Sequence, residues 1–429
     1  MHLEYIYRLL HLSMNRFKIL CAVLMGFLLS NCRNPADHSD ISTASLKELP
    51  VLCQEGGMPN LFVSETGTIF LTWIEFLNDT TDALYFSTMK RDKWSTPGTI
   101  ALGTDWFVNW ADFPSLAVYR GNDDFLTVHW LRKSASGTYD YDIQIAQSQD
   151  HGRHWRQRFI PHRDSVAAEH GFVSLLPLPQ YKMLAVWLDG RKMVSSDTPH
   201  ANHDHGHGGP MTLRCAIFDT EGYISYEHEL DDQVCECCQT DAVIASSGIV
   251  VVYRDRSAEE VRDISIVRFR KGQWTTPKTI YTDNWKIAGC PVNGPAIAAV
   301  GDTLAVAWFS APEGVAQVKV AFSFDGGETF ANPVRIDEGK PLGRVDIVML
   351  SRNEAFVSWI ENTDHGAQVV AATVGPKQKR GENIVITHTS ESRQSGFPVM
   401  EKTGTKIVFA WTQVDSVSVV KTATLALHE

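Results

Sequence analysis

Short apolar runs that end near an aromatic residue recur along the chain at an almost constant spacing. The aromatic residues are, in chain order, Trp73, Trp130, Trp187, Tyr253, Trp308, Trp359 and Trp411. By subtraction of positions, successive members lie 57, 57, 66, 55, 51 and 52 residues apart. Apolar and polar positions alternate within the runs, which favours β-strands, and no long stretch has helical periodicity. The pattern therefore predicts an all-β repeat protein.

Each repeat contains further strand-like runs beside the one that ends in the aromatic residue. A shorter apolar run precedes it, as at 114–117, and a third run follows, as at 143–146. In most repeats a fourth run opens at a Trp or Phe turn, as at Trp94 and Trp274. Four short strands in a repeat of about fifty residues are typical of β-propeller blades. The sequence therefore predicts a single β-propeller of four-stranded blades.

The number of blades follows from the count of repeats and from the two ends of the chain. Seven repeats can be counted, but a divergent end repeat could mislead the count, so six blades are the alternative. The last repeat, from Phe397 onward, ends before an obvious fourth strand. Residues 42–52 can supply that strand and close the ring. This closure favours seven blades.

Two turns carry a more specific pattern. Residues 148–155 and 323–330 both match Ser-x-Asp-x-Gly-x-x-aromatic. The Asp can accept hydrogen bonds from amides of its own turn, and the Gly supplies a positive-φ position. These turns resemble the Asp boxes of the sialidase-like, BNR-repeat propellers. Because Asp boxes are structural turns, the resemblance supports the fold and says little about the chemistry.

The N-terminal segment resembles an export signal. Residues 14–18 are basic, and residues 19–29 are apolar but too few to span a bilayer comfortably. The sequence Leu29-Ser30-Asn31-Cys32 resembles the lipobox of bacterial lipoproteins, which implies cleavage before Cys32 and lipidation of its thiol. An ordinary secretory signal is the alternative. We expect a signal peptide over 1–31, a lipidated tether over 32–50 and the propeller over 51–429.

Export and charge narrow the location and the partners. The lipobox implies a protein anchored by lipid alone, at the outer membrane or cell surface. The formal net charge of −11 argues against a nucleic-acid binder, which needs a basic face. An anionic ligand would need a local cluster of arginines. We expect a monomer.

Reactive side chains gather in the loops of one predicted face. In a four-stranded blade, the loop before the first strand and the loop after the second strand share a face, and the Asp-box turns lie on the other. We call the first of these the top face. Its predicted loops hold the cysteines Cys235, Cys237, Cys238 and Cys290. This gathering predicts a ligand site at the top centre of the propeller.

The four top-face cysteines allow two interpretations. In an oxidising compartment, disulfides that join the two loops are expected for clustered cysteines. Thiols clustered this tightly also suit a soft metal ion, copper or zinc, although Cys-x-Cys-Cys is not a common zinc spacing. Cys215 is expected to be buried and inert. A nearby loop with His200, His203, His205 and His207 could hold a divalent cation or have only adventitious affinity.

The resemblance to sialidases implies a different use of the same face. Such enzymes hold the substrate carboxylate with three arginines and use a Tyr–Glu pair as nucleophile and an Asp as acid/base. The candidates for binding an acidic glycan are Arg191, Arg254, Arg256, Arg344, Trp106, Trp110 and Trp285. The candidates for catalysis are Asp112, Glu169, Asp241, Tyr253 and Asp255. A salt-bridge ladder is the structural alternative for the segment 254–263.

One departure from the family pattern weakens the enzymatic interpretation. Sialidases carry an Arg-Ile-Pro motif near the first strand, whereas this chain has Gly57-Met58-Pro59 there. Three functions therefore stay open. The first is a sialidase-like glycoside hydrolase, or a relative that binds acidic glycans without cleaving them. The second is a cysteine-rich metal-binding or redox propeller. The third is a non-catalytic interaction scaffold.

Overall fold

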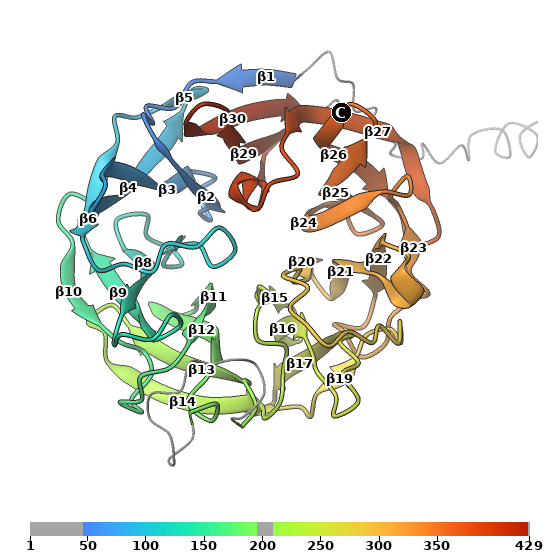
Figure 1. The fold of residues 1–429 in the computed structure, drawn as a ribbon, viewed down its shortest axis with the longest axis horizontal. Helices are drawn as coiled ribbons and strands as arrows, with labels where there is room; N and C mark the ends of the chain where they lie inside the picture. The colour runs from blue at the N-terminus through green and yellow to red at the C-terminus, as the bar shows by residue number, and fades with distance from the viewer. Residues whose placement is uncertain (1–45, 195–208, 428–429) are drawn as a thin grey trace, which may run out of the picture. The chain divides into compact units, whose positions relative to one another are not determined.

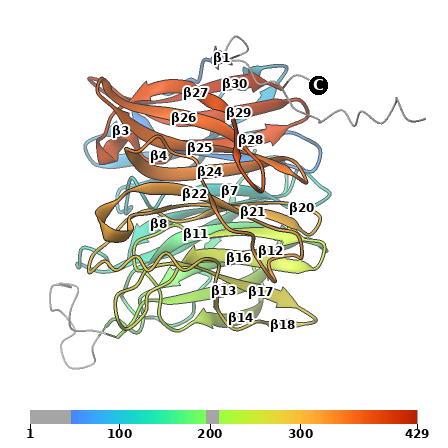
Figure 2. The same cartoon turned by 90° about the vertical axis from the view of Figure 1, so that its right-hand side faces the viewer.

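The computed structural model describes residues 46–194 and 209–427, which belong to one compact unit. Strands in these residues form seven antiparallel sheets, arranged as blades around a central axis (Figures 1 and 2). The predicted seven-bladed propeller is confirmed, and the six-bladed alternative is wrong. In the described ranges no helix has the length and apolar character needed to cross a bilayer. The predicted signal peptide, Cys32 and most of the histidine-rich loop lie outside the described residues.

Within each blade, successive strands along the chain lie progressively farther from the central axis. Blade 1 contains β2 (Gly56–Val63), β3 (Ile69–Asn78), β4 (Thr81–Lys90), β5 (Lys93–Trp94) and β6 (Gly98–Gly103). Blade 2 contains β7 (Ser115–Val118), β8 (Leu126–Lys133), β9 (Tyr141–Ser148) and β10 (Arg156–Phe159). Blade 3 contains β11 (His170–Leu178), β12 (Lys182–Asp189), β13 (Thr212–Asp219) and β14 (Ile224–Asp231). Blade 4 contains β15 (Asp241–Ala245), β16 (Gly248–Arg254), β17 (Ile264–Arg270), β18 (Gln273–Trp274) and β19 (Lys278–Thr279).

The remaining blades repeat the arrangement. Blade 5 contains β20 (Ala296–Val300), β21 (Thr303–Ser310), β22 (Gln317–Ser323) and β23 (Val334–Arg335), with the short helix η2 (Pro312–Gly314). Blade 6 contains β24 (Pro341–Ser351), β25 (Glu354–Thr363), β26 (Gly366–Val374) and β27 (Lys379–Thr389). After η3 (Arg393–Ser395), blade 7 contains β28 (Val399–Thr403), β29 (Lys406–Val414) and β30 (Ser418–Ala426).

The ring is closed by the N-terminal strand. The strand β1 (Leu46–Leu49) pairs antiparallel with β30, with Leu46 opposite Leu425 and Leu49 opposite Thr422. Figure 1 shows this blue strand lying along the red last blade. The fourth strand of blade 7 therefore comes from the segment 42–52, as predicted. Backbone hydrogen bonds between the two ends of the chain hold the first and last blades together.

The repeated aromatic residues lie in the buried cores of the blades. Trp73, Trp187 and Trp359 have no exposed surface, and their indole N–H groups need acceptors there. Trp187 Nε1 donates to Asp189 Oδ2 at 2.8 Å, and Trp359 Nε1 donates to Glu361 Oε2 at 2.6 Å. The acceptor stands two residues after the Trp in each case. Asp189 therefore has a structural role that recurs between blades, as the acceptor of the indole hydrogen bond.

Both Asp-box turns have the predicted internal bonding. Asp150 Oδ1 accepts from the backbone N–H of His154 at 2.9 Å, and Asp325 Oδ1 accepts from that of Thr329 at 2.9 Å. The turns join β9 to β10 and β22 to β23, at the ends opposite the top face. The structure thus confirms the prediction that the Asp boxes face away from the reactive loops.

Carboxylates near the central axis join neighbouring blades. Asp112 Oδ1 accepts from the N–H of Phe172 at 2.7 Å, which links blades 2 and 3. Asp241 Oδ2 accepts from the N–H of Ile297 at 2.8 Å, and Asp346 Oδ2 accepts from the N–H of Met400 at 2.6 Å. Each carboxyl oxygen thereby satisfies a backbone N–H of the neighbouring blade. Asp112 and Asp241, two of the catalytic candidates, therefore have structural partners.

Candidate functional site

Two loops of the top face bring the cysteines together. The loop 235–240 follows the bridge between Val234 and Asp255 and leads into β15. The N–H of Cys235 donates to the carbonyl of Arg254 at 3.1 Å, so the loop is held against the end of β16. The loop before β20 approaches from blade 5, and the N–H of Asn293 there donates to Cys238 Sγ at 3.4 Å. Both loops are therefore held by backbone hydrogen bonds.

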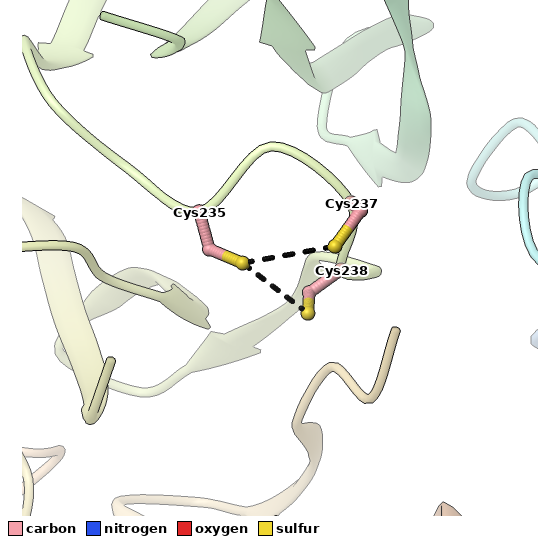
Figure 3. Close-up of side chains that lie close together, drawn as sticks. All are labelled: Cys235, Cys237 and Cys238. Carbon is pink, nitrogen blue, oxygen red and sulfur yellow. Dashed lines mark hydrogen bonds between the residues drawn. The ribbon is translucent and has the colours of Figure 1, made fainter. Parts of the chain in front are cut away.

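Three sulfur atoms converge in the first loop. Cys235 Sγ lies 3.9 Å from Cys237 Sγ and 3.6 Å from Cys238 Sγ (Figure 3). These separations exceed the length of a disulfide bond, about 2.05 Å, and the six described cysteines form no disulfide. Cys235 and Cys238 are buried, whereas Cys290 is exposed. The structure therefore brings three of the four predicted top-face cysteines into one compact cluster.

Arginines surround the sulfur cluster. Arg262 Nη1 donates to Cys235 Sγ at 3.1 Å and to Glu236 Oε2 at 2.7 Å. Arg256 forms a second ion pair with Glu236 from the solvent side. Burial raises the pKa of Cys238, and the positive charge of Arg254, also buried, opposes that rise. Positive charge in a buried site favours a thiolate over a thiol.

The four thiols differ in their affinity for protons. Burial alone would raise the pKa of Cys235, but hydrogen bonds from Cys237 and Cys238, with the charge of Arg262, hold it well below the usual value. The pKa of Cys237 is raised well above its usual value, mainly because hydrogen-bonding interactions with Cys235, Cys238 and Cys290 favour its protonated form. The pKa of Cys290 is lowered, mainly by the hydrogen bond from Cys237. The surroundings therefore favour the thiolate form at Cys235 and Cys290 and the protonated form at Cys237 and Cys238.

A second polar network lies beside the thiols. Tyr141 Oη donates at 2.9 Å to Glu169 Oε1 and lies 3.1 Å from Asp112 Oδ2. The pKa of Glu169 is raised to about 8, mainly by burial; the Tyr141 hydrogen bond opposes the shift, and the charges of Asp112, Cys290 and Glu236 add to it. Burial also raises the pKa of Asp112 to about 7. Glu169 is therefore protonated near neutral pH. Tyr141 itself is fully buried under Phe107, with ring centroids 4.1 Å apart.

The arginine candidates have separate partners. Arg254 donates to the carbonyls of Asn293, Arg262 and Phe309 at 2.9, 2.6 and 2.6 Å. Arg191 pairs with Asp189 at 2.7 Å and with Asp164 at 2.8 Å. Arg256 pairs with Glu236 and Glu260. Arg344 donates to the carbonyl of Gly396 at 3.0 Å and to Ser395 Oγ at 2.7 Å. The structure does not gather them around one free pocket among the described residues.

The aromatic candidates pack mainly against protein. Trp106 and Trp285 are buried, and Trp285 lies under the Arg254 guanidinium at 4.9 Å from the ring centroid. Trp110 is half-buried and stacks on Phe397 with centroids 5.8 Å apart. The Arg344 guanidinium covers its ring at 4.9 Å. Only Trp110, of these three, has a ring within reach of a ligand.

The last two catalytic candidates belong to the blade 4 framework. Tyr253 is fully buried and donates to Asp231 Oδ2 at 2.5 Å. Asp255 accepts from Ser265 Oγ at 2.8 Å. The Tyr–Glu pair that sialidase chemistry implies is not formed by Tyr253, and the Tyr that meets Glu169 is Tyr141. Sequence spacing could not identify this pair, because Tyr141 begins a third strand and the other catalytic candidates come from loops and second strands.

The structure adds residues that the sequence analysis missed. Glu236 stands inside the cysteine motif, is 4% exposed and pairs with two arginines. The sequence did contain a signal for this residue, namely an acidic side chain in the middle of a cysteine triplet. Cys215 is buried in β13, as predicted.

Comparisons with known proteins give a fold and no family. No protein-family model matches the chain, and no curated protein matches it. A protein of unknown function from Dyadobacter fermentans matches with a TM-score of 0.50 and 12% identity, over 90% of this chain and 100% of that chain. A variant of the NanB sialidase from Streptococcus pneumoniae matches with a TM-score of 0.46 and 9% identity, over 84% and 83%. The GH93 α-L-arabinofuranosidase of Fusarium graminearum matches with a TM-score of 0.48 and 12% identity, over 89% and 97%.

The chain is similar in fold to these proteins. The likeness is distant and extends to sialidases and other carbohydrate-active propellers. At such identities it concerns the fold alone, and function must be argued from the residues of the site.

Proposed function

We propose that this propeller binds a soft metal ion with a filled d shell, Cu(I) or Zn²⁺, through the thiolates of Cys235, Cys237 and Cys238. The spacing of the sulfurs carries the proposal, at 3.9 and 3.6 Å from Cys235 to its two partners. Sulfur ligands about 2.3 Å from one ion stand about 3.8–4.0 Å apart in tetrahedral or trigonal geometry. The loop therefore already has nearly the shape of a thiolate metal site.

The surrounding charges support the same function. Several thiolates around a monovalent or divalent ion leave net negative charge in a buried place, which is costly unless it is compensated. Arg262 contacts Cys235 directly, and the positive charge of Arg254 favours the thiolate form of Cys238 against the effect of burial. Such second-shell groups orient the ligands and tune the affinity of a site. Glu236 fixes Arg262 and Arg256 in place.

Cys290 provides the entry side of the proposed site. Its thiol is exposed, comes from the neighbouring blade and accepts the Cys237 hydrogen bond. We expect Cys290 to complete a four-sulfur shell for Zn²⁺ or to receive Cu(I) from solvent and pass it inward. The expected export of the chain places the site outside the cytoplasm, where a bound ion would protect the thiols from oxidation to disulfides.

The direct test is metal content together with a thiol count. The mature chain from residue 33 would be exported to an oxidising compartment and purified without a histidine tag. We expect stoichiometric copper or zinc that is lost in Cys237→Ser/Cys238→Ser and kept in Cys53→Ser, a matched change at a cysteine outside the cluster. Reloading the reduced apoprotein with Cu(I) and with Zn²⁺ separately identifies the ion.

Two outcomes would overturn this function. One is a protein whose reduced form takes up neither ion. The other is equal metal content in Cys237→Ser/Cys238→Ser and in the unsubstituted chain. Loss of free thiols without any metal would instead identify the cysteines as disulfide staples.

A second candidate function, binding of an acidic glycan, is favoured by the surroundings of Arg344. This guanidinium is 6% exposed, and no carboxylate of the described residues lies within ion-pair distance of it. The nearby charge of Arg393 adds to burial in lowering the pKa of Arg344 to about 10. Both guanidinium groups lie over the Trp110 ring, at 4.9 and 6.0 Å from its centroid. A carboxylate-bearing sugar would neutralise the pair and could pack against the ring.

The glycan candidate has its own measurement. Calorimetric titration with N-acetylneuraminic acid and with glucuronate oligosaccharides should show binding that Arg393→Met weakens by about ten-fold or more, the loss of one charge-assisted hydrogen bond. Neutral oligosaccharides of the same size are the ligand control. Arg335→Met, at an exposed arginine paired with Asp337, is the matched protein control. Equal heats for acidic and neutral sugars would contradict this candidate.

A further inference from the structure

A second cluster of metal-ligating side chains lies on the top face, between blades 2 and 3. Asp142 is the second residue of β9, and His170 is the first residue of β11. His162 and Asp164 stand in the connection that joins these blades, and Asp189 ends β12. His162 is 5% exposed, and His170 and Asp189 are fully buried. None of these residues belongs to the thiolate site or to the glycan candidates.

The two imidazole rings are held between two carboxylates. Their centroids are 3.7 Å apart and their planes differ by 6°. At one edge, His162 Nε2 and His170 Nδ1 each lie 3.7 Å from Asp142 Oδ1. At the other edge, His162 Nδ1 lies 3.3 Å and His170 Nε2 lies 3.2 Å from Asp164 Oδ2. Each edge thus pairs two ring nitrogens with one carboxylate oxygen.

The ring nitrogens are not satisfied by these contacts. Neither nitrogen of His162 has a hydrogen-bond partner in the described structure, and Nε2 of His170 also has none. The fourth ring nitrogen, His170 Nδ1, lies 3.3 Å from the carbonyl oxygen of Tyr141. At 3.7 Å the Asp142 edge is too wide for a hydrogen bond. Leaving several buried polar atoms unpaired in one place is costly, and an unpaired cluster calls for an explanation such as an ion.

The charges distinguish the two edges. Arg191 pairs with Asp164 at 2.8 Å and with Asp189 at 2.7 Å, so the Asp164 edge already has a cation. No Lys or Arg of the described residues lies within ion-pair distance of Asp142. The Asp142 side chain is also 21% exposed, which gives an ion and its water ligands a route to solvent. A metal ion would therefore bind at the Asp142 edge.

We propose that Asp142, His162 and His170 bind a divalent first-row transition-metal ion of the Zn²⁺ class. Their ligand atoms lie within 4.8 Å of one another. Because χ2 of histidine is a soft torsion, the stacked rings can open and direct Nε2 of His162 and Nδ1 of His170 to one ion, with Nδ1 exchanging its long contact to the Tyr141 carbonyl for the ion. Asp164 would then accept the N–H at the far side of each ring, the usual second-shell role of a carboxylate. Two imidazoles and a carboxylate suit such an ion better than Ca²⁺ or Mg²⁺.

The test uses Co²⁺ as an optical probe on the full mature chain. His200, His203, His205 and His207 would first be replaced by alanine, which removes adventitious binding by that segment. Cys237→Ser/Cys238→Ser would be added so that the cluster of three thiols is disrupted. We expect a weak visible Co²⁺ spectrum without a sulfur charge-transfer band, together with a higher unfolding temperature. Zn²⁺ should displace the Co²⁺.

The variants separate ligation from folding. Asp142→Asn keeps the shape of the side chain, and we expect it to weaken Zn²⁺ binding by more than about ten-fold. His228→Ala, an exposed histidine of the same blade, should bind like its parent. Equal Zn²⁺ affinity in Asp142→Asn and its parent, or no Co²⁺ binding by the folded parent, would overturn the proposal. Because Cys237 and Cys238 are replaced in all these proteins, the result does not depend on the three-thiolate site.

Discussion

Arg262→Met is expected to destabilise the propeller by about 3–5 kcal/mol, because it removes one partner of a buried ion pair. Arg262 and Glu236 side chains are 3% and 5% exposed, and their atoms approach to 2.7 Å. Methionine would fill most of the volume but would leave Glu236 with Arg256 alone. It would also remove the cation that contacts Cys235 Sγ at 3.1 Å. If the thiolate site binds metal, its affinity should fall by about ten- to a hundred-fold.

Arg256→Met is the matched control for this prediction. Arg256 binds the same Glu236, but its side chain is 24% exposed. It makes no contact with sulfur among the described residues, so its loss should cost less stability and leave the metal affinity nearly unchanged. The measurements are chemical denaturation of the apoproteins and competition titration of the metal. Equal stability of the two variants would show that Glu236 does not need Arg262.

The stability of the folded protein should fall as the pH rises from about 5 to about 8. Three carboxyls line the central channel, a cavity of about 520 Å³: Asp241, Asp346 and Glu401. Their pKa values are raised to about 6, 7 and 8, mainly by burial, and for Glu401 the negative charges of Asp346 and Asp241 contribute to the shift. A raised pKa means that the folded state holds a proton that the unfolded chain releases. The stabilisation is therefore complete below the ordinary value, 4.5 for Glu401, and is lost through the raised value.

Glu401→Gln isolates the largest of these contributions. Each proton held only by the folded state gives a slope of about 1.4 kcal/mol per pH unit. The amide of glutamine cannot ionise, so the variant should have a flatter pH profile and should be the more stable protein at pH 8. Thermal unfolding of both proteins across this range provides the measurement. Identical slopes would mean that Glu401 is already ionised in the folded state, against the prediction.

The site was only partly predictable, because contacts across blades depend on the register of the whole ring. The triplet Cys235, Cys237 and Cys238 indicated a cluster, since three cysteines within four residues must lie close together. The sequence did not reveal which cation compensates the charge of this cluster, because Arg262 is brought to Cys235 by the turn that follows β16. His162 and His170 looked unrelated to Asp142, since their contact depends on the packing of blade 3 against blade 2.

The catalytic and binding roles that the resemblance to sialidases implied were the hardest to predict from the spacing of residues along the chain. Arg254 follows an aromatic residue at the end of a second strand, where a ligand-binding arginine would be expected. The structure shows its guanidinium bound to three carbonyls, which suits a residue that joins loops of blades 4 and 5. Arg344, from the same candidate set, has no carboxylate partner among the described residues. Only the tertiary surroundings distinguish the two arginines.

The architecture could be predicted from the sequence alone, because the repeat recurs in every blade. Strand periodicity, the recurring Trp and the Asp-box turns are local patterns, each contained within about fifty residues, and the strand pattern recurs from blade to blade. The closing role of residues 42–52 also followed, since an unpaired strand edge in blade 7 needs a partner. Tertiary structure alone decided which top-face groups meet. Sulfur, imidazole, carboxylate and guanidinium groups come from different blades, and their separations depend on blade packing and burial rather than on distance along the chain.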